Sequence, residues 1–160
     1  MKSVAVTAAR FTLCALALGA GMVAPVAAEE YTAVMPDSLT WKDAPSIGPG
    51  AKTAVIDGDP KSPGSFVMRL KLAPKSKIGV HTHPADENVT VLSGTLYFAA
   101  GDKFDAKKAK PFGPGSYFSI GKGKPMFAYT MDDETVVQLN GIGPWGLTYL
   151  NGADSSATKK

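Results

Sequence analysis

The sequence predicts an all-β domain, built as a small barrel or sandwich of antiparallel strands. Short β-branched or aromatic runs alternate with Gly, Pro, Asp and Lys, and no long stretch has the periodicity of a helix. Residues 65–72 show the pattern most clearly, because large apolar side chains alternate there with Val, Arg and Lys. Turn residues recur at a spacing typical of barrels and sandwiches.

The expected strands cover most of the chain after residue 38. They span residues 39–42, 53–57, 65–72, 79–83, 88–92, 95–99, 117–120, 126–130, 135–140 and 146–150. Ser93 and Gly94 predict a two-residue hairpin turn, because such a turn needs the positive φ that Gly adopts readily. We expect the Lys-rich loop at 103–110 to be solvated and mobile.

Residues 1–28 are interpreted as a secretory signal peptide that is absent from the folded protein. Lys2 and Arg10 form a basic start, residues 11–23 are apolar, and small residues follow at the cleavage positions. The apolar run is too short to favour a permanent membrane anchor. We therefore expect cleavage after Ala28 and a periplasmic or secreted bacterial protein with no membrane association afterwards.

The rest of the chain is long enough for one domain, which we place at residues 29–152, before a flexible tail at 153–160. The only cysteine, Cys14, lies in the signal peptide, so the mature chain has no disulfide and no thiolate metal ligand. Cleavage also lowers the modest formal net charge of +3, and the remaining basic residues are scattered among acidic ones. This distribution argues against nucleic acid as a partner.

Both histidines of the chain lie in one short group, His81-x-His83-x-x-x-Glu87. Side chains two apart in a strand point to the same face, so the two imidazoles are expected side by side. Two imidazoles and one carboxylate are a ligand set for a divalent transition metal. His81, His83 and Glu87 are therefore the candidate metal ligands.

The residues around this group resemble the cupins, which are small double-sheet β-barrels. The first cupin motif is a glycine followed by HxH, three or four residues, Glu, six residues and Gly. His81, His83, Glu87 and Gly94 fit this motif, whereas Lys75 stands in place of the leading glycine. The resemblance implies the cupin double-stranded β-helix, a jelly-roll-like small barrel, in an exported single-domain protein. It also implies a homodimer, because cupins commonly pair through sheet edges.

The second cupin motif departs from the family at its metal ligand. It corresponds to Gly115-x5-Gly121-x-Gly123-x-x-Met126, where the family usually has His in place of Met126. Three interpretations stay open. The two histidines and Glu87 act alone with open positions, which suits Fe or Mn; or the Met126 thioether joins them and selects Cu; or Met126 only fills the core and metal binding is weak or lost. Zn or Ni is a further option.

Further side chains are expected in a pocket beside the metal. They are Met68, Tyr97, Phe127 and Asn140, with Trp145 as an additional aromatic candidate. Ordinary packing is the competing explanation for the aromatic residues, as strand-end pairing is for Asn140.

Two classes of function follow from the ligand set. One is a metal-dependent enzyme of the dioxygenase or isomerase type, because the ion would polarise a carbonyl or enolate of a small molecule, or acidify bound water. The other is a non-catalytic binding protein for a small ligand or a metal, such as copper held through Met126. The sequence has no Ser/His/Asp set, no phosphate-cradling loop and no dedicated general base, because Glu87 is a candidate ligand and the other carboxylates lie in turns; this weakens the case for an enzyme.

Overall fold

The computed structural model describes residues 31–151. By its internal contacts the chain divides into two units, Met1–Tyr31 and Thr32–Lys160, and the fold below is that of the second. The expected signal peptide at 1–28 and the expected tail at 153–160 lie outside the described residues. Within 31–151, no helix has the length and apolar character needed to cross a membrane.

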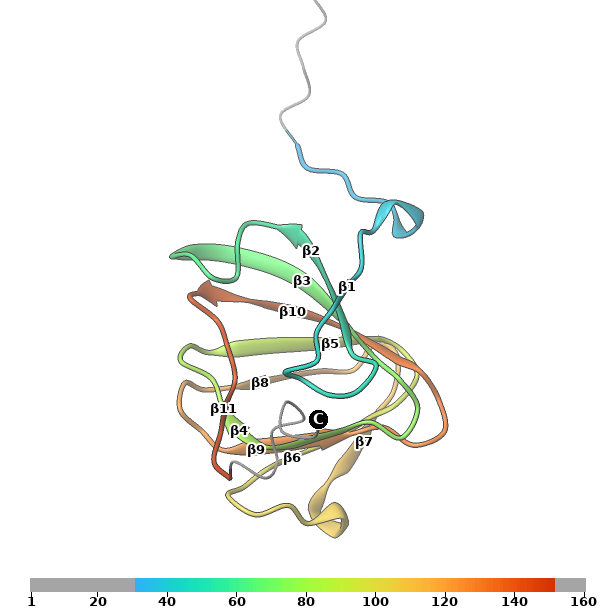
Figure 1. The fold of residues 1–160 in the computed structure, drawn as a ribbon, viewed down its shortest axis with the longest axis vertical. Helices are drawn as coiled ribbons and strands as arrows, with labels where there is room; N and C mark the ends of the chain where they lie inside the picture. Colours follow the sequence, from blue (N-terminus) through green and yellow to red (C-terminus); the bar gives the residue numbers. More distant parts are fainter. Residues whose placement is uncertain (1–30, 152–160) are drawn as a thin grey trace, which may run out of the picture. The chain divides into compact units, whose positions relative to one another are not determined.

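Two antiparallel sheets form the domain and lie as two layers in Figure 1. One sheet has six strands in the order β1-β2-β3-β10-β5-β8, and the other has five in the order β11-β4-β9-β6-β7. The elements are η1 (Pro36–Ser38), β1 (Lys42–Asp43), β2 (Lys52–Asp57), β3 (Gly64–Leu72), β4 (Lys77–Thr82), β5 (Glu87–Ser93), β6 (Leu96–Ala100), η2 (Ala106–Lys108), β7 (Lys110–Phe112), β8 (Tyr117–Ile120), β9 (Met126–Tyr129), β10 (Thr135–Gly143) and β11 (Thr148–Tyr149). The all-β prediction is confirmed.

The main hydrophobic core lies between the two sheets, because alternate residues of each strand point inward. Its buried members are Ile47, Ala51, Phe66, Met68, Leu70, Leu72, Ile78, Val89, Val91, Leu96, Ala128, Val137 and Leu139. A smaller buried cluster contains Val80, Ala99 and Phe127 and belongs to the five-stranded sheet.

The loop at 103–110 differs from its prediction. The ring of Phe104 packs on Phe127 with 4.6 Å between centroids, and the Lys77 amine lies 4.2 Å from the centre of the Phe104 ring. Within this segment η2 forms, capped by the Asp105 side chain, which accepts a hydrogen bond from the Lys107 amide. The lysines of the loop are exposed, as expected, but Phe104 is packed on the apolar cluster, so the expectation of a solvated loop fails at this residue. The mobility of the loop stays a prediction.

Strand β4 contains an irregularity that decides which side chains enter the barrel. Its pairing with β9 shifts between Ile78, which lies opposite Ala128, and His81, which lies opposite Met126. Three residues of β4 therefore span the same length as two of β9, as in a β-bulge. Because of this extra residue, Ile78 and His81 both face the interior, although strict alternation would turn one of them outward.

Two turns show how the chain meets the backbone requirements of the first motif. Gly94 has φ +70°, and a Cβ there would collide with the carbonyl oxygen of Glu134, so the hairpin requires glycine. Lys75, at the place of the leading glycine, has φ +59° and is the only non-glycine residue with positive φ between residues 31 and 151. The backbone at this turn keeps a conformation that favours glycine, although the residue is a lysine.

Candidate functional site

A cavity of about 40 Å³ lies between the sheets, and it has both polar and apolar walls. Its lining residues are Ile47, Leu70, Leu72, Ile78, His81, His83, Glu87, Val89, Leu96, Phe98, Phe118, Met126, Ala128, Val137, Leu139, Trp145 and Leu147. The two histidines and the glutamate come from β4, the residue after it, and the start of β5. Each of the three is 4 to 5% exposed.

The orientation of both imidazoles is fixed from behind by backbone carbonyls. The Nδ1 of His81 lies 2.7 Å from the Gly79 oxygen, and the Nδ1 of His83 lies 2.7 Å from the Gly146 oxygen. A carbonyl oxygen only accepts, so each Nδ1 carries the proton and donates it. Each Nε2 therefore keeps a lone pair, which is the state that binds a metal ion.

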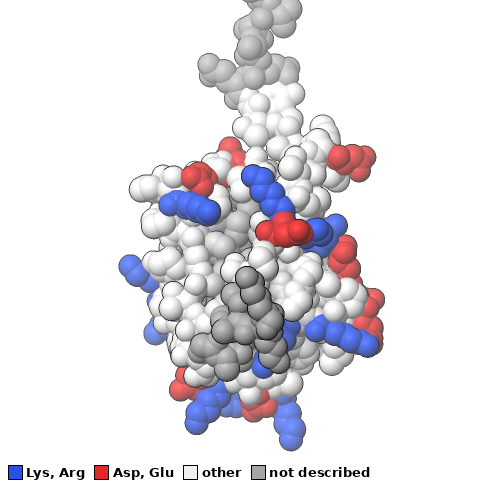
Figure 2. Space-filling view, in the orientation of Figure 1, with Lys and Arg blue, Asp and Glu red and all other residues white. Residues whose placement is uncertain are grey.

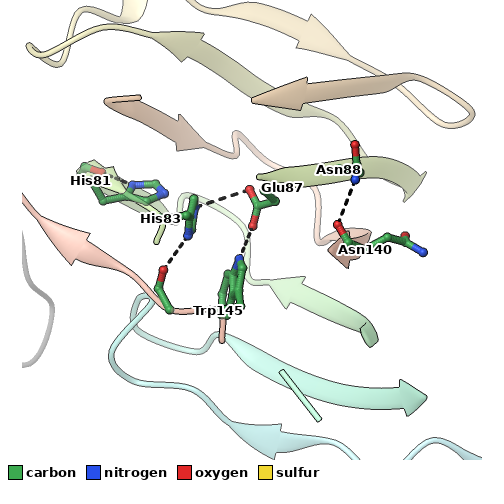
Figure 3. A network of polar contacts seen from close by, with 8 residues as sticks. His81, His83, Glu87, Asn88, Asn140 and Trp145 are labelled. Carbon is green, nitrogen blue, oxygen red and sulfur yellow. Dashed lines mark hydrogen bonds and ion pairs between the residues drawn. The ribbon is translucent and has the colours of Figure 1, made fainter. Parts of the chain in front are cut away.

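The Nε2 of His83 and the carboxylate of Glu87 face each other without a hydrogen bond. Nε2 lies 3.5 Å from the Glu87 Oε2, which is within ion-pair range, yet this nitrogen is buried and has no hydrogen-bond partner. Buried polar atoms are nearly always paired, so an unpaired one calls for an explanation. In Figure 3, His83 lies between His81 and Glu87.

Trp145 holds Glu87 and His83 at the same time. Its indole N–H donates to the Glu87 Oε1 over 2.9 Å, and its ring stacks on His83 at 5.1 Å between centroids and 19° between planes. The neighbouring Gly146 supplies the carbonyl that binds His83. One short segment after β10 thus orients two of the three candidate ligands, as Figure 3 shows.

Burial controls the charge state of these groups. It raises the pKa of Glu87 to about 7, against the opposing effect of the Trp145 hydrogen bond. It lowers the pKa of His83 to about 4, aided by the neighbouring His81, and it also lowers the pKa of His81. Between about pH 4 and 7 the His83 and Glu87 side chains are both neutral in the metal-free protein. Their contact is therefore not a salt bridge in that range.

The three side chains come together but do not form a completed ligand cluster. No group of three or more His, Cys, Asp or Glu residues in the described part of the chain is arranged to hold a metal ion. The rings of His81 and His83 meet edge to face at 4.9 Å, and His81 also contacts the ring of Tyr149 at 5.9 Å. Metal binding by these residues therefore stays a prediction.

Met126 shares the cavity with the histidines and the glutamate. It begins β9 opposite His81, it is 3% exposed, and its side chain lines the same cavity. This placement is compatible with the thioether as a ligand and with plain packing, so both interpretations of Met126 stay open.

None of the four side chains expected in the pocket lines this cavity. Met68 packs in the main core, Phe127 belongs to the second cluster, and Tyr97 stacks on Tyr129 at 4.9 Å. Tyr97 and Phe127 alternate with cavity residues along β6 and β9, so they point to the other face. Asn140 similarly alternates with Leu139, and its backbone oxygen accepts a bond from Asn88.

Two features of the site were not predicted from the sequence. Trp145 was considered only as a pocket aromatic, and its hydrogen bond to Glu87 was not foreseen. The Gly146 carbonyl was not considered at all, because a backbone oxygen leaves no trace in residue identity. The run Gly143-Pro144-Trp145-Gly146 was the available indication, since an aromatic residue between turn residues marks a loop with a fixed course.

The surface carries charges of both signs, and Figure 2 shows basic and acidic side chains interspersed on the visible face. Ion pairs on the surface join Lys52 to Asp43, Lys71 to Glu134 and Lys75 to Asp132. These pairs are largely solvent-exposed and contribute little to stability.

The double-sheet barrel with a His and Glu group in its cavity has the cupin fold, the double-stranded β-helix. Solved structures with this architecture include the polyketide cyclase RemF from Streptomyces resistomycificus, with a TM-score of 0.61 and 14% identity over 76% of this chain and 88% of that one.

Two further solved structures are similar at the level of the fold. KdgF from Halomonas sp. has a TM-score of 0.53 and 15% identity over 68% of this chain and 91% of that one. An RmlC-like cupin from Shewanella frigidimarina has a TM-score of 0.55 and 14% identity over 69% and 89%. No family model matches the sequence, and no curated protein matches it.

Proposed function

We propose that this protein binds one divalent transition metal through His81, His83 and Glu87 and acts on a small molecule in the adjoining cavity. The observation that carries the proposal is the His83 Nε2, which is buried, has no hydrogen-bond partner and faces the Glu87 Oε2. A metal ion is the group that accepts both a lone pair and a carboxylate oxygen at such a point.

The spacing of these two atoms supports the proposal. Two ligands that each lie about 2.1 Å from one tetrahedral ion are about 3.4 Å apart. The His83 Nε2 and the Glu87 Oε2 are 3.5 Å apart. The Glu87 Oε1 is occupied by the Trp145 N–H, which leaves Oε2 as the oxygen available for the ion. His81 would complete the set through its Nε2.

Each remaining contact of the site has a defined role. The Gly79 and Gly146 carbonyls keep the proton on Nδ1 of their histidines, and the Trp145 indole orients the carboxylate. The apolar walls make the cavity an unfavourable environment for water. A bound divalent ion would supply Lewis-acid chemistry, which polarises a carbonyl or an enolate.

The enzyme interpretation, an oxygenase or isomerase of a small molecule, is supported by the cavity that the candidate ligands line. Polyketide cyclase RemF is an enzyme with this fold. Among the described residues, the cavity lining offers no titratable side chain besides the two histidines and Glu87, so a reaction there would rely on these groups and the bound ion.

A second candidate function rests on Met126. Its side chain lines the same cavity and its backbone lies opposite His81 in the sheet. A thioether beside two imidazoles favours copper, in which case the protein binds or transfers the metal without catalysis.

We also propose that the protein is exported and acts in the periplasm or outside the cell. The support is the pattern of residues 1–28, with a basic start, an apolar stretch and small residues before the expected cleavage point.

The test is metal content after loading with Fe(II), Mn(II), Cu and Zn in turn. We expect one ion per chain, higher thermal stability with the ion, and loss of both in His83→Ala and Glu87→Gln. The matched control is Glu134→Gln, which changes an exposed glutamate that pairs with Lys71 and should keep the metal. Wild-type protein that holds no stoichiometric metal under any loading condition would contradict the proposal.

A further inference from the structure

Away from the candidate ligands, the described side chains that line the cavity are apolar or nearly so. Besides His81, His83 and Glu87 they are aliphatic or aromatic, except Met126, whose thioether is only a weak acceptor. The one remaining polar group, the Trp145 indole N–H, already donates to Glu87. A molecule in this cavity therefore meets polar partners at one end only.

The basic side chains of the neighbouring strand are turned away from this wall. Leu70 and Leu72 of β3 line the cavity, whereas Arg69 and Lys71 alternate with them and belong to the other face of the sheet. Lys71 pairs there with Glu134 and lies over the Trp41 ring. Within residues 31–151, no Lys or Arg side chain lines the cavity to balance an anionic group.

We infer that the natural ligand is a compact molecule with a single polar donor group and an otherwise apolar, uncharged body, and that molecules with a second charged group, such as a carboxylate or phosphate away from the donor, are rejected. This inference rests on the proposed function, because the donor group would point at the metal. A second charge on the ligand would lie against aliphatic side chains, and burying an unpaired charge is strongly unfavourable. The cavity volume of about 40 Å³ is small, so the body must be compact.

Two probes of matched shape test this class of ligand. 4-Methylpyrazole and pyrazole-4-carboxylate share a donor nitrogen and differ only in the group on the far side of the ring. We expect the metal-loaded protein to bind 4-methylpyrazole at least about tenfold more tightly, by isothermal titration calorimetry, because its methyl group meets an apolar wall. Equal affinity, or tighter binding of the carboxylate, would overturn the inference and leave metal binding untouched.

A change in the wall should weaken the preference. Leu147 lines the cavity and is only partly buried, so the amine of Leu147→Lys can reach both solvent and a carboxylate in the cavity, and the variant can remain folded. We expect Leu147→Lys to lower the ratio of the affinities for 4-methylpyrazole and pyrazole-4-carboxylate at least about tenfold, because the lysine can pair with the carboxylate. The control is Leu150→Lys, because Leu150 is 43% exposed and does not line the cavity. A preference that stays unchanged in Leu147→Lys, with the variant folded by circular dichroism, would contradict the inference.

The two proposals fail in different ways. If no metal binds, the proposed function is wrong, and the same probes are then titrated into the metal-free protein. The apolar wall is unchanged there, so 4-methylpyrazole must still bind more tightly than the carboxylate. Equal affinity for the two probes there, or tighter binding of the carboxylate, would overturn the inference about the ligand.

Discussion

Residues of both cupin motifs line the same cavity, but the first motif contributes polar side chains and the second contributes a thioether. The first supplies His81, His83 and Glu87, whereas the second supplies the side chain of Met126. Orientation of the ligands has a third source, the segment with Trp145 and Gly146. Because the second motif has Met126 where cupins usually have a histidine, only one end of the cavity is polar. The ligands at this polar end are oriented by a segment near the carboxyl end of the domain.

A change of pH should have the largest effect on metal binding at the polar end of the cavity, which is formed by His81, His83 and Glu87. Burial raises the pKa of Glu87 to about 7, so below that pH a metal ion must displace the proton of this carboxyl group. The pKa of His83 is lowered to about 4, so this imidazole does not compete for protons above that value. Metal affinity should therefore fall about tenfold per pH unit from pH 7 to 5, about a hundredfold in all.

Competition titrations with a chelator of known pH dependence measure this slope. One proton per metal is the expected stoichiometry in that range. A steeper fall that begins near pH 6.5 would show that the histidines titrate as exposed groups do, and would contradict the buried site described here.

Removing the support from the carboxyl end should have the next largest effect. Trp145→Phe keeps an aromatic ring beside His83 but deletes the N–H that binds Glu87. Loss of such a supporting hydrogen bond typically lowers metal affinity by about 10- to 100-fold, and we expect about tenfold. Trp41→Phe is the control, because Trp41 contacts Lys71 and not the cavity. Equal metal affinity of the two variants would argue against the role of Trp145.

The contribution of the second motif is tested by Met126→Leu, which keeps the volume and removes the sulfur. If the polar end acts alone, affinity for Fe(II) or Mn(II) should change by less than about threefold. Met68→Leu is the matched control, because Met68 is equally buried but packs in the core outside the cavity. A large loss of copper affinity in Met126→Leu alone would favour the copper-binding alternative.

The smallest expected effect concerns the first residue of the first motif. Lys75 has φ +59°, which is unfavourable for a side chain with a Cβ, so Lys75→Gly should stabilise the fold by about 1 kcal/mol. The midpoint temperature of thermal unfolding should then rise by a few degrees, and the metal affinity should not change. Lys103→Gly is the control, because Lys103 lies in a bend without positive φ, and it should not stabilise the protein.

The sequence predicted the fold because the pattern of the strands is repeated along the chain and the first motif is intact. It could not predict the shift in β4, because a bulge depends on how two strands pair and not on the residues of one. For the same reason Tyr97 and Phe127 were expected in the cavity although they point away from it, since a change of one residue in register moves a side chain to the other face.

The candidate ligands were identifiable because the chain has only two histidines and both lie in the motif. The partners of these ligands were not identifiable. Gly79 and Gly146 act through backbone carbonyls, and Trp145 acts through a contact over 58 positions in the sequence. Such contacts become visible only when the sheets are assembled.

The bond between His83 and the Gly146 carbonyl joins residues 63 positions apart, and this separation orders events during synthesis. A growing chain that ends before Trp145 already carries every candidate ligand, but it lacks the groups that orient His83 and Glu87; only His81 already has its partner, the Gly79 carbonyl. Because two of the three ligands are oriented by the last-made part of the domain, we expect the unfinished polypeptide to bind metal ions more weakly than the completed domain. Selection of the proposed metal would then wait until the domain is complete.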